Sequence, residues 1–154
     1  MIRMFPKLNF PSYDFKIKTA DKVTQIFDIV RRKYVALTPE EWVRQHFIHY
    51  LVNEKKISQS LLAVEMNIRM NNLQKRCDIV GYNNSGNPVL IVECKAPDVK
   101  ISQKTFEQVA LYNIILQVKY LAVSNGLNHF FCEIDIKKKS YRFLKGINFN
   151  TLAH

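Results

Sequence analysis

The spacing of apolar residues changes several times along the chain, and each spacing predicts a different element. The first regular run begins at residues 38–41, Thr-Pro-Glu-Glu, which supply an N-cap, a first-turn proline and a capping-box glutamate. Val43, Phe47 and Leu51 then recur at helical spacing. This pattern predicts an amphipathic helix over residues 39–56.

Three strands are predicted next. Apolar residues alternate with mostly polar ones over 61–70, which is the period of a strand with one buried face. Residues 76–82 form a second strand and residues 89–94 a third, whose nearly continuous apolar run favours a central position. The Asn, Ser, Gly and Pro residues at 83–88 favour a tight reversal. The second and third strands are therefore expected to form a β-hairpin.

The remaining elements complete an α/β pattern. Ser102 can cap a helix that runs to about Gln117. A short apolar strand at 120–124 follows, and an alternating strand at 129–136 comes last. The order of helix, three strands, helix and two strands predicts one mixed sheet with helices on both faces.

A chain of 154 residues fits a single domain. We divide it into a basic N-terminal extension (1–37), a core (38–136) and a basic tail (137–154). The extension is expected to be an arm with short strands, of which Val23–Asp28 is a candidate. The net charge of +10 lies in the two ends, each of which carries +5. Basic ends favour a polyanion such as DNA or RNA, although lysine and arginine can also serve solubility alone.

Other features argue against membrane and secreted proteins. The apolar runs are far shorter than the ~20 residues of a membrane span, and residues 1–10 lack the apolar core of a secretory signal. The three cysteines include no C-x-x-C pair, which favours free thiols. A cytoplasmic protein that does not enter a membrane is expected.

The predicted hairpin brings charged residues together. A turn centred between Ser85 and Gly86 places Asp78 across from Glu93, and Arg76 across from Lys95. Because side chains alternate along a strand, these four share one face, and Cys77 and Cys94 meet on the other as structural thiols.

Two converging carboxylates suit a hard divalent cation such as Mg²⁺, with water and phosphate as its further ligands. A neighbouring lysine can stabilise the negative charge that develops during phosphodiester hydrolysis. The competing interpretation is a cross-strand ion-pair cluster at the edge of a sheet.

These residues resemble a known nuclease superfamily. Asp78, followed after a turn by Glu93-x-Lys95 and flanked by two helices, resembles the PD-(D/E)XK, or restriction-endonuclease-like, nucleases. Over residues 23–135 the chain more closely resembles the N-terminal nuclease domain of type I restriction enzyme R proteins. The motifs that carry this resemblance are Ile26-Phe27-Asp28, the segment from Tyr34 to His46, Arg76-x-Asp78, Glu93-Cys-Lys-Ala-Pro97 and Gln108-x-x-x-Tyr112.

The resemblance implies a restriction-endonuclease-like αβββαβ core and a role for each matching residue. Asp78 and Glu93 become ligands of Mg²⁺ or Mn²⁺, and the backbone carbonyl of Cys94 becomes a further ligand. Lys95 positions or polarises the attacking water. The first-helix acid is best matched by Glu40, with Glu41 as the alternative.

Several further residues are candidates for supporting roles. Gln108 and Tyr112 match a Q-x-x-x-Y element beside the site, or form an ordinary helix face. Arg76 contacts a scissile phosphate or holds Asp78 ionised. A basic group in the tail is expected either to follow a DNA backbone or to be solvated: Lys137, Lys138, Lys139 and Arg142. His46 and His49 could ligate a metal, but no third ligand is evident, so surface or capping roles are favoured.

Two departures from the family pattern stand out. Cys77 occupies the position before Asp78 where the superfamily name has proline. The sequence also contains no G-x-x-x-x-G-K-[ST] phosphate loop, so an ATP-driven motor is not expected within it.

The sequence therefore predicts a metal-dependent DNA endonuclease. RNA remains open as a substrate, and the alternative function is a non-catalytic DNA-binding or complex-assembly module. Expected partners are DNA, a second copy in a homodimer, and separate helicase or specificity subunits.

Overall fold

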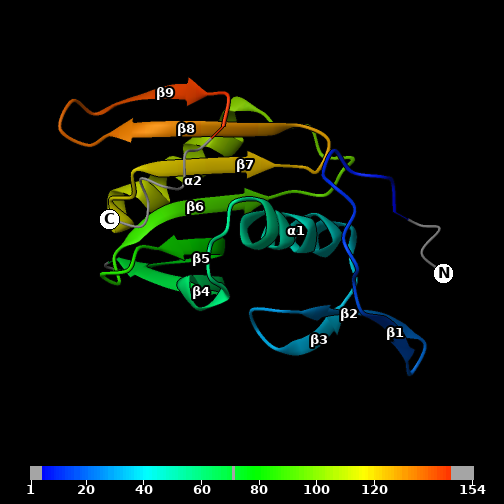
Figure 1. The fold of residues 1–154 in the computed structure, drawn as a ribbon. Helices are drawn as coiled ribbons and strands as arrows, with labels where there is room; N and C mark the ends of the chain where they lie inside the picture. The colour runs from blue at the N-terminus through cyan, green and yellow to red at the C-terminus, as the bar shows by residue number, and fades with distance from the viewer. Residues whose placement is uncertain (1–4, 71, 147–154) are drawn as a thin grey trace.

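The computed structural model describes residues 5–70 and 72–146, without the side chains of Met70, Leu73, Leu111, Tyr112, Ile114 and Ile115. The described strands form two sheets, one of three strands and one of six (Figure 1). The small sheet has the order β1-β2-β3, with strands Ile17–Ala20, Val23–Asp28 and Lys33–Ala36. The strand predicted at Val23–Asp28 is therefore confirmed.

The large sheet follows chain order from β4 to β9. Its strands are Leu62–Met70, Leu73–Tyr82, Pro88–Cys94, Tyr120–Ser124, His129–Asp135 and Ser140–Leu144. Neighbouring strands are antiparallel except β6 and β7, which are parallel because the helix α2 (Gln103–Leu116) carries the chain back between them. The predicted mixed α/β sheet is confirmed.

The two helices cover opposite faces of the large sheet, as expected (Figure 1). On one face, Phe47 of α1 (Pro39–His49) packs in a core with Ile79 and Val92. On the other, Val109 of α2 packs with Val80 and Ile91. Successive residues of β5 and β6 thus supply the two cores, which explains the nearly continuous apolar run of β6.

The first helix begins as predicted and changes form before its predicted end. The Thr38 hydroxyl accepts a hydrogen bond from the Glu41 backbone N–H at 3.1 Å, which confirms the N-cap. The α-helix ends at His49, and a π-helix follows at Tyr50–Glu54. There the Lys55 N–H donates to the Tyr50 carbonyl at 3.1 Å, one residue further back than in an α-helix.

The predicted hairpin register is confirmed. Ile79 pairs with Val92 and Val80 with Ile91, so continuing the register places Asp78 opposite Glu93. In the turn, the Gly86 N–H donates to the Asn83 carbonyl at 3.0 Å.

The prediction that Cys77 and Cys94 share a face is wrong, although both are buried. Cys77 packs in the core on the α2 side and Cys94 in the core on the α1 side. The alternation of β5 is lost between Cys77 and Ile79, and β4 is also irregular at the position opposite Asp78. Glu65 there has a φ of 54° and breaks the regular pairing between Val64 and Met66.

The C-terminal basic segment contains a strand that the sequence analysis does not predict. Ser140–Leu144 form β9, the edge of the large sheet, and Phe143 pairs with Cys132 of β8. Its residues alternate as in a strand, but the segment is short and follows three lysines, so the basic composition favours a tail. The core of the fold therefore extends into the segment treated as a tail.

The N-terminal segment is bound to the core on the α1 side. The Asn9 N–H donates to the Gly126 carbonyl at 2.7 Å, and the Trp42 indole N–H donates to the Pro6 carbonyl at 3.2 Å. Leu8 is buried in the α1-side core. Gly126 has a φ of 85°, and a Cβ there would lie 2.7 Å from the Leu8 side chain.

Substituting Gly126 with alanine is therefore expected to strain the backbone and displace Leu8. Gly86→Ala is a matched control, since Gly86 has a φ of 82° and open space around it. We expect Gly86→Ala to lower the free energy of unfolding by about 1–2 kcal/mol, and Gly126→Ala to lower it by a further ~1–3 kcal/mol through overpacking. Urea unfolding measures both values, and equal losses would show that Leu8 does not anchor the segment.

Candidate functional site

Asp78 and Glu93 lie side by side where β5 and β6 separate. The regular β5–β6 pairing stops at Ile79 and Val92. One step further, the Asp78 Oδ2 accepts a hydrogen bond from the Cys94 backbone N–H at 2.7 Å. The carboxylate thus replaces a strand partner and is held in place by the backbone of β6. Asp78 and Glu93 are both buried, with 8% and 9% of their surfaces exposed.

The Glu93 carboxyl group is only partly satisfied. Its Oε1 lies 3.4 Å from the Lys95 Nζ. Its Oε2 is buried and has no hydrogen-bond partner among the described atoms. Burial and the neighbouring Asp78 carboxylate raise the pKa of Glu93 to about 8, although Lys95 opposes the rise. A buried carboxylate oxygen without a donor, beside a second carboxylate, is suited to a cation.

Asp78 also belongs to a buried chain of ion pairs that reaches the small sheet. Its Oδ1 accepts from the Arg44 Nη2 at 2.9 Å, and the Arg44 Nη1 donates to Glu41 at 2.9 Å. Glu41 in turn accepts from Arg31 at 2.6 Å, and the Arg31 Nε donates to Asp28 at 2.7 Å. Asp28, Glu41 and Arg44 are buried. We call these five residues the ion-pair chain.

Two further residues support the ion-pair chain. The Gln45 side-chain amide donates to both Asp28 and Glu41, at 2.8 and 2.9 Å. Glu65 lies 3.1 Å from Arg31 and 3.2 Å from Arg44. The facing carboxylates raise the pKa of Arg44 further above its usual value despite burial. Arg44 therefore stays charged and fixes the orientation of Asp78.

The structure separates the two candidate first-helix acids. Glu40 is half-buried; burial and the nearby Asp78 raise its pKa, and Arg44 and Lys95 lower it. Glu40 is thus close enough to sense the Asp78 and Lys95 charges. The Glu41 carboxylate instead accepts hydrogen bonds from Arg31, Arg44 and Gln45. Its side chain therefore belongs to the ion-pair chain and does not complete a capping box with Thr38.

The other predicted residues do not gather as closely. The Arg76 side chain is 61% exposed and lies 3.7 Å from Glu65, so Arg44 is the cation that holds Asp78. Gln108 is exposed on α2. The Tyr112 side chain lies outside the described part of the chain, so a Gln108–Tyr112 pair beside the site stays a prediction. The Cys94 carbonyl as a ligand also stays a prediction.

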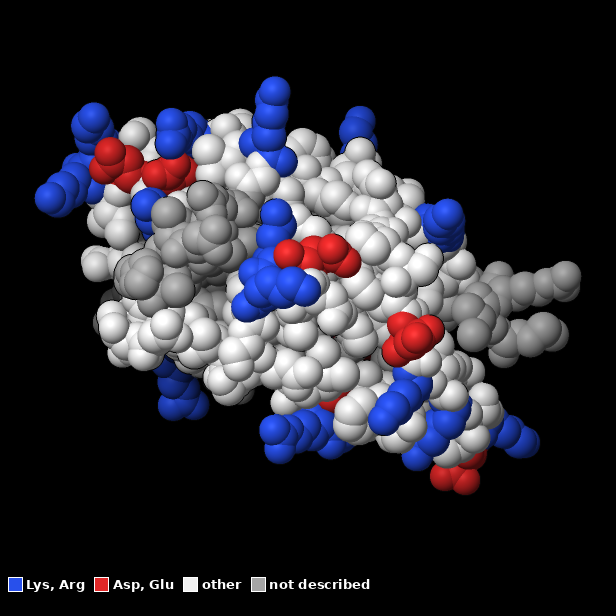
Figure 2. Space-filling view, viewed as in Figure 1, with Lys and Arg blue, Asp and Glu red and all other residues white. Residues whose placement is uncertain are grey.

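The basic residues of the tail divide into two groups. Lys137, Lys138 and Lys139 are exposed in the turn between β8 and β9. Arg142 lies in β9 and donates to Glu133 of β8 at 2.6 Å. Figure 2 shows lysine and arginine along the β8–β9 edge and around β1–β3. The three lysines remain candidates for binding phosphates, whereas Arg142 already has an anionic partner.

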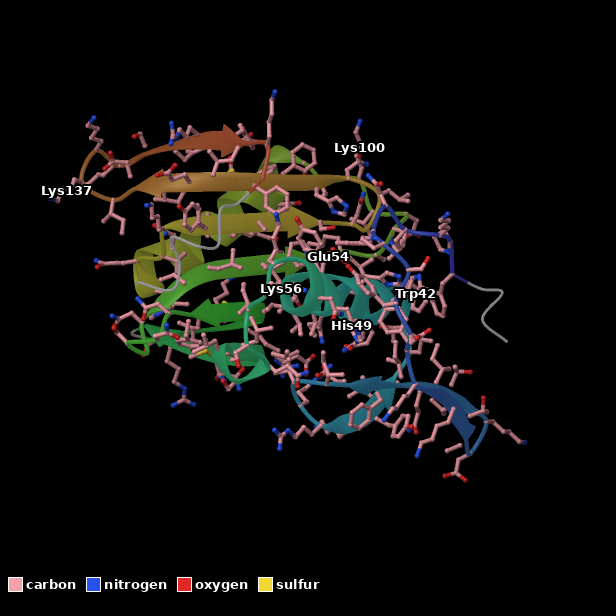
Figure 3. The ribbon with its side chains drawn as sticks, viewed as in Figure 1. Trp42, His49, Glu54, Lys56, Lys100 and Lys137 are labelled. Carbon is pink, nitrogen blue, oxygen red and sulfur yellow. The ribbon has the colours of Figure 1, made fainter. Side chains whose placement is uncertain are left out.

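His46 and His49 lie inside an aromatic cluster rather than at the surface (Figure 3 labels His49 and Trp42). The His46 ring lies 4.3 Å from the Trp42 ring and 4.7 Å from that of Phe15, between centroids. Its Nδ1 bonds the Trp42 carbonyl at 2.8 Å. Burial lowers the pKa of both histidines. Both therefore act as packing residues of α1.

The donor set of Asp78 and Glu93 fits a magnesium-like cation. No group of three His, Cys, Asp or Glu side chains in the described residues is arranged to hold a metal ion. Mg²⁺ is commonly held by one or two carboxylates, with water and phosphate completing its octahedron. The two carboxylates, one of which has a buried oxygen without a donor, meet that requirement. No helix of the described chain is long and apolar enough to cross a membrane.

Fold and site together define a small mixed α/β protein with a two-carboxylate, one-lysine site at the end of a central strand. Comparison with family models matches residues 39–147 to the type I restriction enzyme R protein N terminus (HSDR_N). The chain belongs to this family, since the match covers most of its length. No curated protein matches the chain.

A solved structure gives a more distant similarity. It is a fragment assigned to the HsdR subunit of a type I restriction enzyme from Vibrio vulnificus YJ016. The similarity has 20% sequence identity and a TM-score of 0.40, and it covers 56% of the present chain. The present chain spans 18% of that chain.

The raised pKa of Glu93 predicts a pH-dependent stability in metal-free buffer. The folded state keeps a proton on Glu93 up to a pH of about 8, whereas the unfolded chain releases it near 4.5. Between these values the folded state binds more protons, so stability falls as pH rises, by at most about 1.4 kcal/mol per pH unit. Glu93→Gln is expected to remove this slope. Urea unfolding in EDTA at pH 5–8 measures it, and parallel curves for both proteins would contradict the prediction.

The ion-pair chain predicts a large cost for removing one buried charge. Glu41→Gln leaves Arg31 and Arg44 short of an anionic partner, so we expect a loss of about 3–5 kcal/mol in the free energy of unfolding. Glu133→Gln removes the partner of the exposed Arg142 and is the control, expected to cause little change. Urea unfolding compares them, and similar small losses would show that the ion-pair chain is not a stabilising unit.

Proposed function

We propose that the chain is a metal-dependent endonuclease domain that hydrolyses DNA phosphodiester bonds. One observation carries the proposal: Asp78 and Glu93 form a buried carboxylate pair in which the Glu93 Oε2 has no donor, and Lys95 lies 3.4 Å from the same glutamate. Membership of the R-protein N-terminal family gives a restriction role as the context.

Each residue has a distinct task in this proposal. Asp78 and Glu93 hold Mg²⁺ or Mn²⁺, with the Cys94 carbonyl and Glu40 as further oxygen donors. The bound cation supplies Lewis-acid polarisation of the phosphate and activation of water. Lys95 orients the attacking water and stabilises the charge that develops on the phosphate oxygens. Arg44 positions Asp78 through its 2.9 Å hydrogen bond and does not contact the substrate.

The lysine has the right surroundings for this task. Its side chain is 27% exposed, so its ammonium group reaches solvent from the end of β6. The Lys95 backbone N–H donates to the Ser124 carbonyl at 2.8 Å, which ties its position to β7. Glu93 would hold the cation together with Asp78, and Lys95, 3.4 Å from Glu93, would then face the phosphate from beside it.

A second function is supported by the contact between Arg44 and Asp78. One oxygen of Asp78 accepts from a guanidinium and the other from a backbone N–H. Such an internally neutralised carboxylate would also suit a fold kept as a non-catalytic DNA-binding or assembly module. In either case the family suggests assembly with helicase or specificity subunits of a restriction system, and cleavage of both strands would require two copies.

Cleavage of supercoiled plasmid distinguishes the two functions. We expect nicking by the wild type with Mg²⁺ or Mn²⁺ and none with EDTA. Lys95→Ala is expected to reduce the rate by at least about 100-fold, because it removes a group that stabilises developing charge. Lys56→Ala, an exposed lysine outside the site, is the matched control and is expected to cut at the wild-type rate.

Agarose gels measure the cleavage, and a gel shift on the same samples measures binding. Equal cutting by the wild type and Lys95→Ala would remove Lys95 from the mechanism. Intact plasmid with both proteins, together with equal gel shifts, would favour the binding module.

A further inference from the structure

The apolar side chains that the described structure exposes are gathered on one surface. Of its seven exposed large apolar residues, five lie in β8, β9 and the adjoining loops. Val99, in the loop before α2, lines a hollow together with Leu127 and Phe130, and the seventh residue is Val23. We call these six the aromatic stripe: Val99, Leu127, Phe130, Phe143, Tyr141 and Ile136. Tyr141 and Phe143 are the most exposed, at 56% and 57%. Scattered apolar residues are ordinary on a protein surface, but a continuous group of this kind indicates a binding site.

Strand pairing explains why these residues share the α2 side of the sheet. Phe143 pairs with Cys132, and Tyr141 pairs with Ile134. Cys132 and Ile134 belong to the α2-side core, so their partners in β9 point to the same face. The helix reaches β9 through Phe106, which contacts Phe143, yet both rings keep more than half of their surface exposed.

The exposed rings support one another. The Phe106 ring of α2 meets those of Phe130 and Phe143 edge-on, with centroids 5.6 and 5.5 Å apart. Tyr141 meets Phe143 edge-on at 5.8 Å. Edge-to-face packing holds the rings in place, and Tyr141 and Phe143 still expose more than half of their surface to a ligand.

Each end of the stripe has a hollow lined by one lysine and one aspartate, Lys100 and Asp98 at one end and Lys139 and Asp135 at the other. At one end, a hollow of about 400 Å³ is lined by residues that include Lys100, Asn125 and Phe130. At the other, a groove of about 530 Å³ between α2 and the β8–β9 hairpin is lined by residues that include Asn113, Lys139 and Tyr141. Figure 3 labels Lys100 and Lys137 at opposite ends of β8, which marks the length of the stripe.

The charge beside the stripe favours an anionic ligand. Residues 135–146 contain four lysines and Arg142 against a single acid, Asp135. Arg142 pairs with Glu133, so the excess comes from Lys137, Lys138, Lys139 and Lys145. Aromatic rings interleaved with lysines are the composition by which proteins bind single-stranded nucleic acids: bases stack on the rings and phosphates lie beside the lysines.

The stripe also lies close to the candidate active site. Glu93 pairs with Val123 across the β6–β7 ladder, and Val123 pairs with Phe130 across the β7–β8 ladder. Phe130 is therefore two strand spacings from Glu93, about 10 Å along the sheet. The residue between them, Val123, is buried in the α2-side core, so this spacing sets the distance between stripe and site and not a surface path.

We propose that the aromatic stripe binds an unpaired DNA strand, with bases stacked on Tyr141 and Phe143 and phosphates beside the turn lysines. The choice of DNA rests on the proposed nuclease function. Bases in a duplex are already stacked and paired, so the rings select a single-stranded segment. The site would thus act on DNA in which a single-stranded stretch adjoins the scissile bond.

Fluorescence anisotropy with labelled dT20 in EDTA tests this proposal, because binding is then measured without cleavage. The double variant Tyr141→Ala/Phe143→Ala is expected to bind about 5- to 100-fold more weakly than the wild type, from the known contribution of base stacking. Tyr141→Phe/Phe143→Tyr keeps both rings and is expected to retain wild-type affinity. Tyr34→Ala, which removes a partly exposed ring from β3, is the matched control. Circular dichroism melting checks that each variant folds.

The outcomes separate this proposal from the nuclease proposal. Equal affinity of the folded double variant and the wild type would overturn the stripe as a binding site. So would a wild type that does not bind dT20 but sediments as a dimer that the double variant loses, because the stripe would then cover a second copy. Binding of dT20 that depends on the two rings, without any plasmid cleavage, would support the stripe and reject the nuclease. Plasmid cleavage that depends on Lys95, together with dT20 binding that does not depend on the rings, would support the nuclease and reject the stripe.

Discussion

The contact between Arg44 and Asp78 is the interaction on which the arrangement of the site depends. A buried carboxylate and a buried guanidinium are each costly in isolation, and each becomes tolerable only when hydrogen-bonded to the other. Asp78 belongs to the hairpin and Arg44 to the first helix, so their contact fixes the helix over that part of the sheet. Arg44 also donates a hydrogen bond to Glu41, which accepts another from Arg31. The same set of ion pairs therefore holds the small N-terminal sheet. Helix, hairpin and small sheet are thereby placed relative to one another by charges rather than by apolar packing alone.

This constraint also separates two acids that are neighbours in sequence. Glu41 faces inward and neutralises two arginines, whereas Glu40 remains half-exposed near Lys95. The chain thus keeps one acid for structure and leaves the other near the carboxylate pair. Glu93 differs again, because its second oxygen has no donor and its pKa is about 8 without a cation. Both oxygens of Asp78 accept a hydrogen bond, whereas one oxygen of Glu93 accepts none, so Glu93 is the carboxylate at which a cation gains most.

Local sequence patterns predicted the features that nearby residues determine, such as strand register, and they missed contacts between residues that are far apart in the sequence. The β5–β6 register follows from alternation and a short turn, so the opposition of Asp78 and Glu93 could be predicted from a few residues. Arg44 lies 34 residues from Asp78, and no local pattern indicates that pairing. One local signal was available: Glu40 and Glu41 stand four and three residues before Arg44, which is the spacing of helical ion pairs. β9 was missed because it is short and follows three lysines, so basic composition outweighed its alternation. The face of Cys77 was mispredicted because the alternation of β5 is lost between Cys77 and Ile79.

The parallel contact between β6 and β7 divides the large sheet into two antiparallel meanders, β4–β6 and β7–β9. Each meander is made of contacts between residues close in sequence, which form early in folding, whereas the parallel joint must wait for the α2 crossover to close a longer loop. Asp78 and Glu93 both lie in the first meander, but the Lys95 backbone is held by Ser124 in the second. The two acids can therefore assemble before the lysine is positioned. We therefore expect a complete site only once the whole sheet has formed, and expect a partly folded chain to hold the carboxylates without a correctly placed lysine.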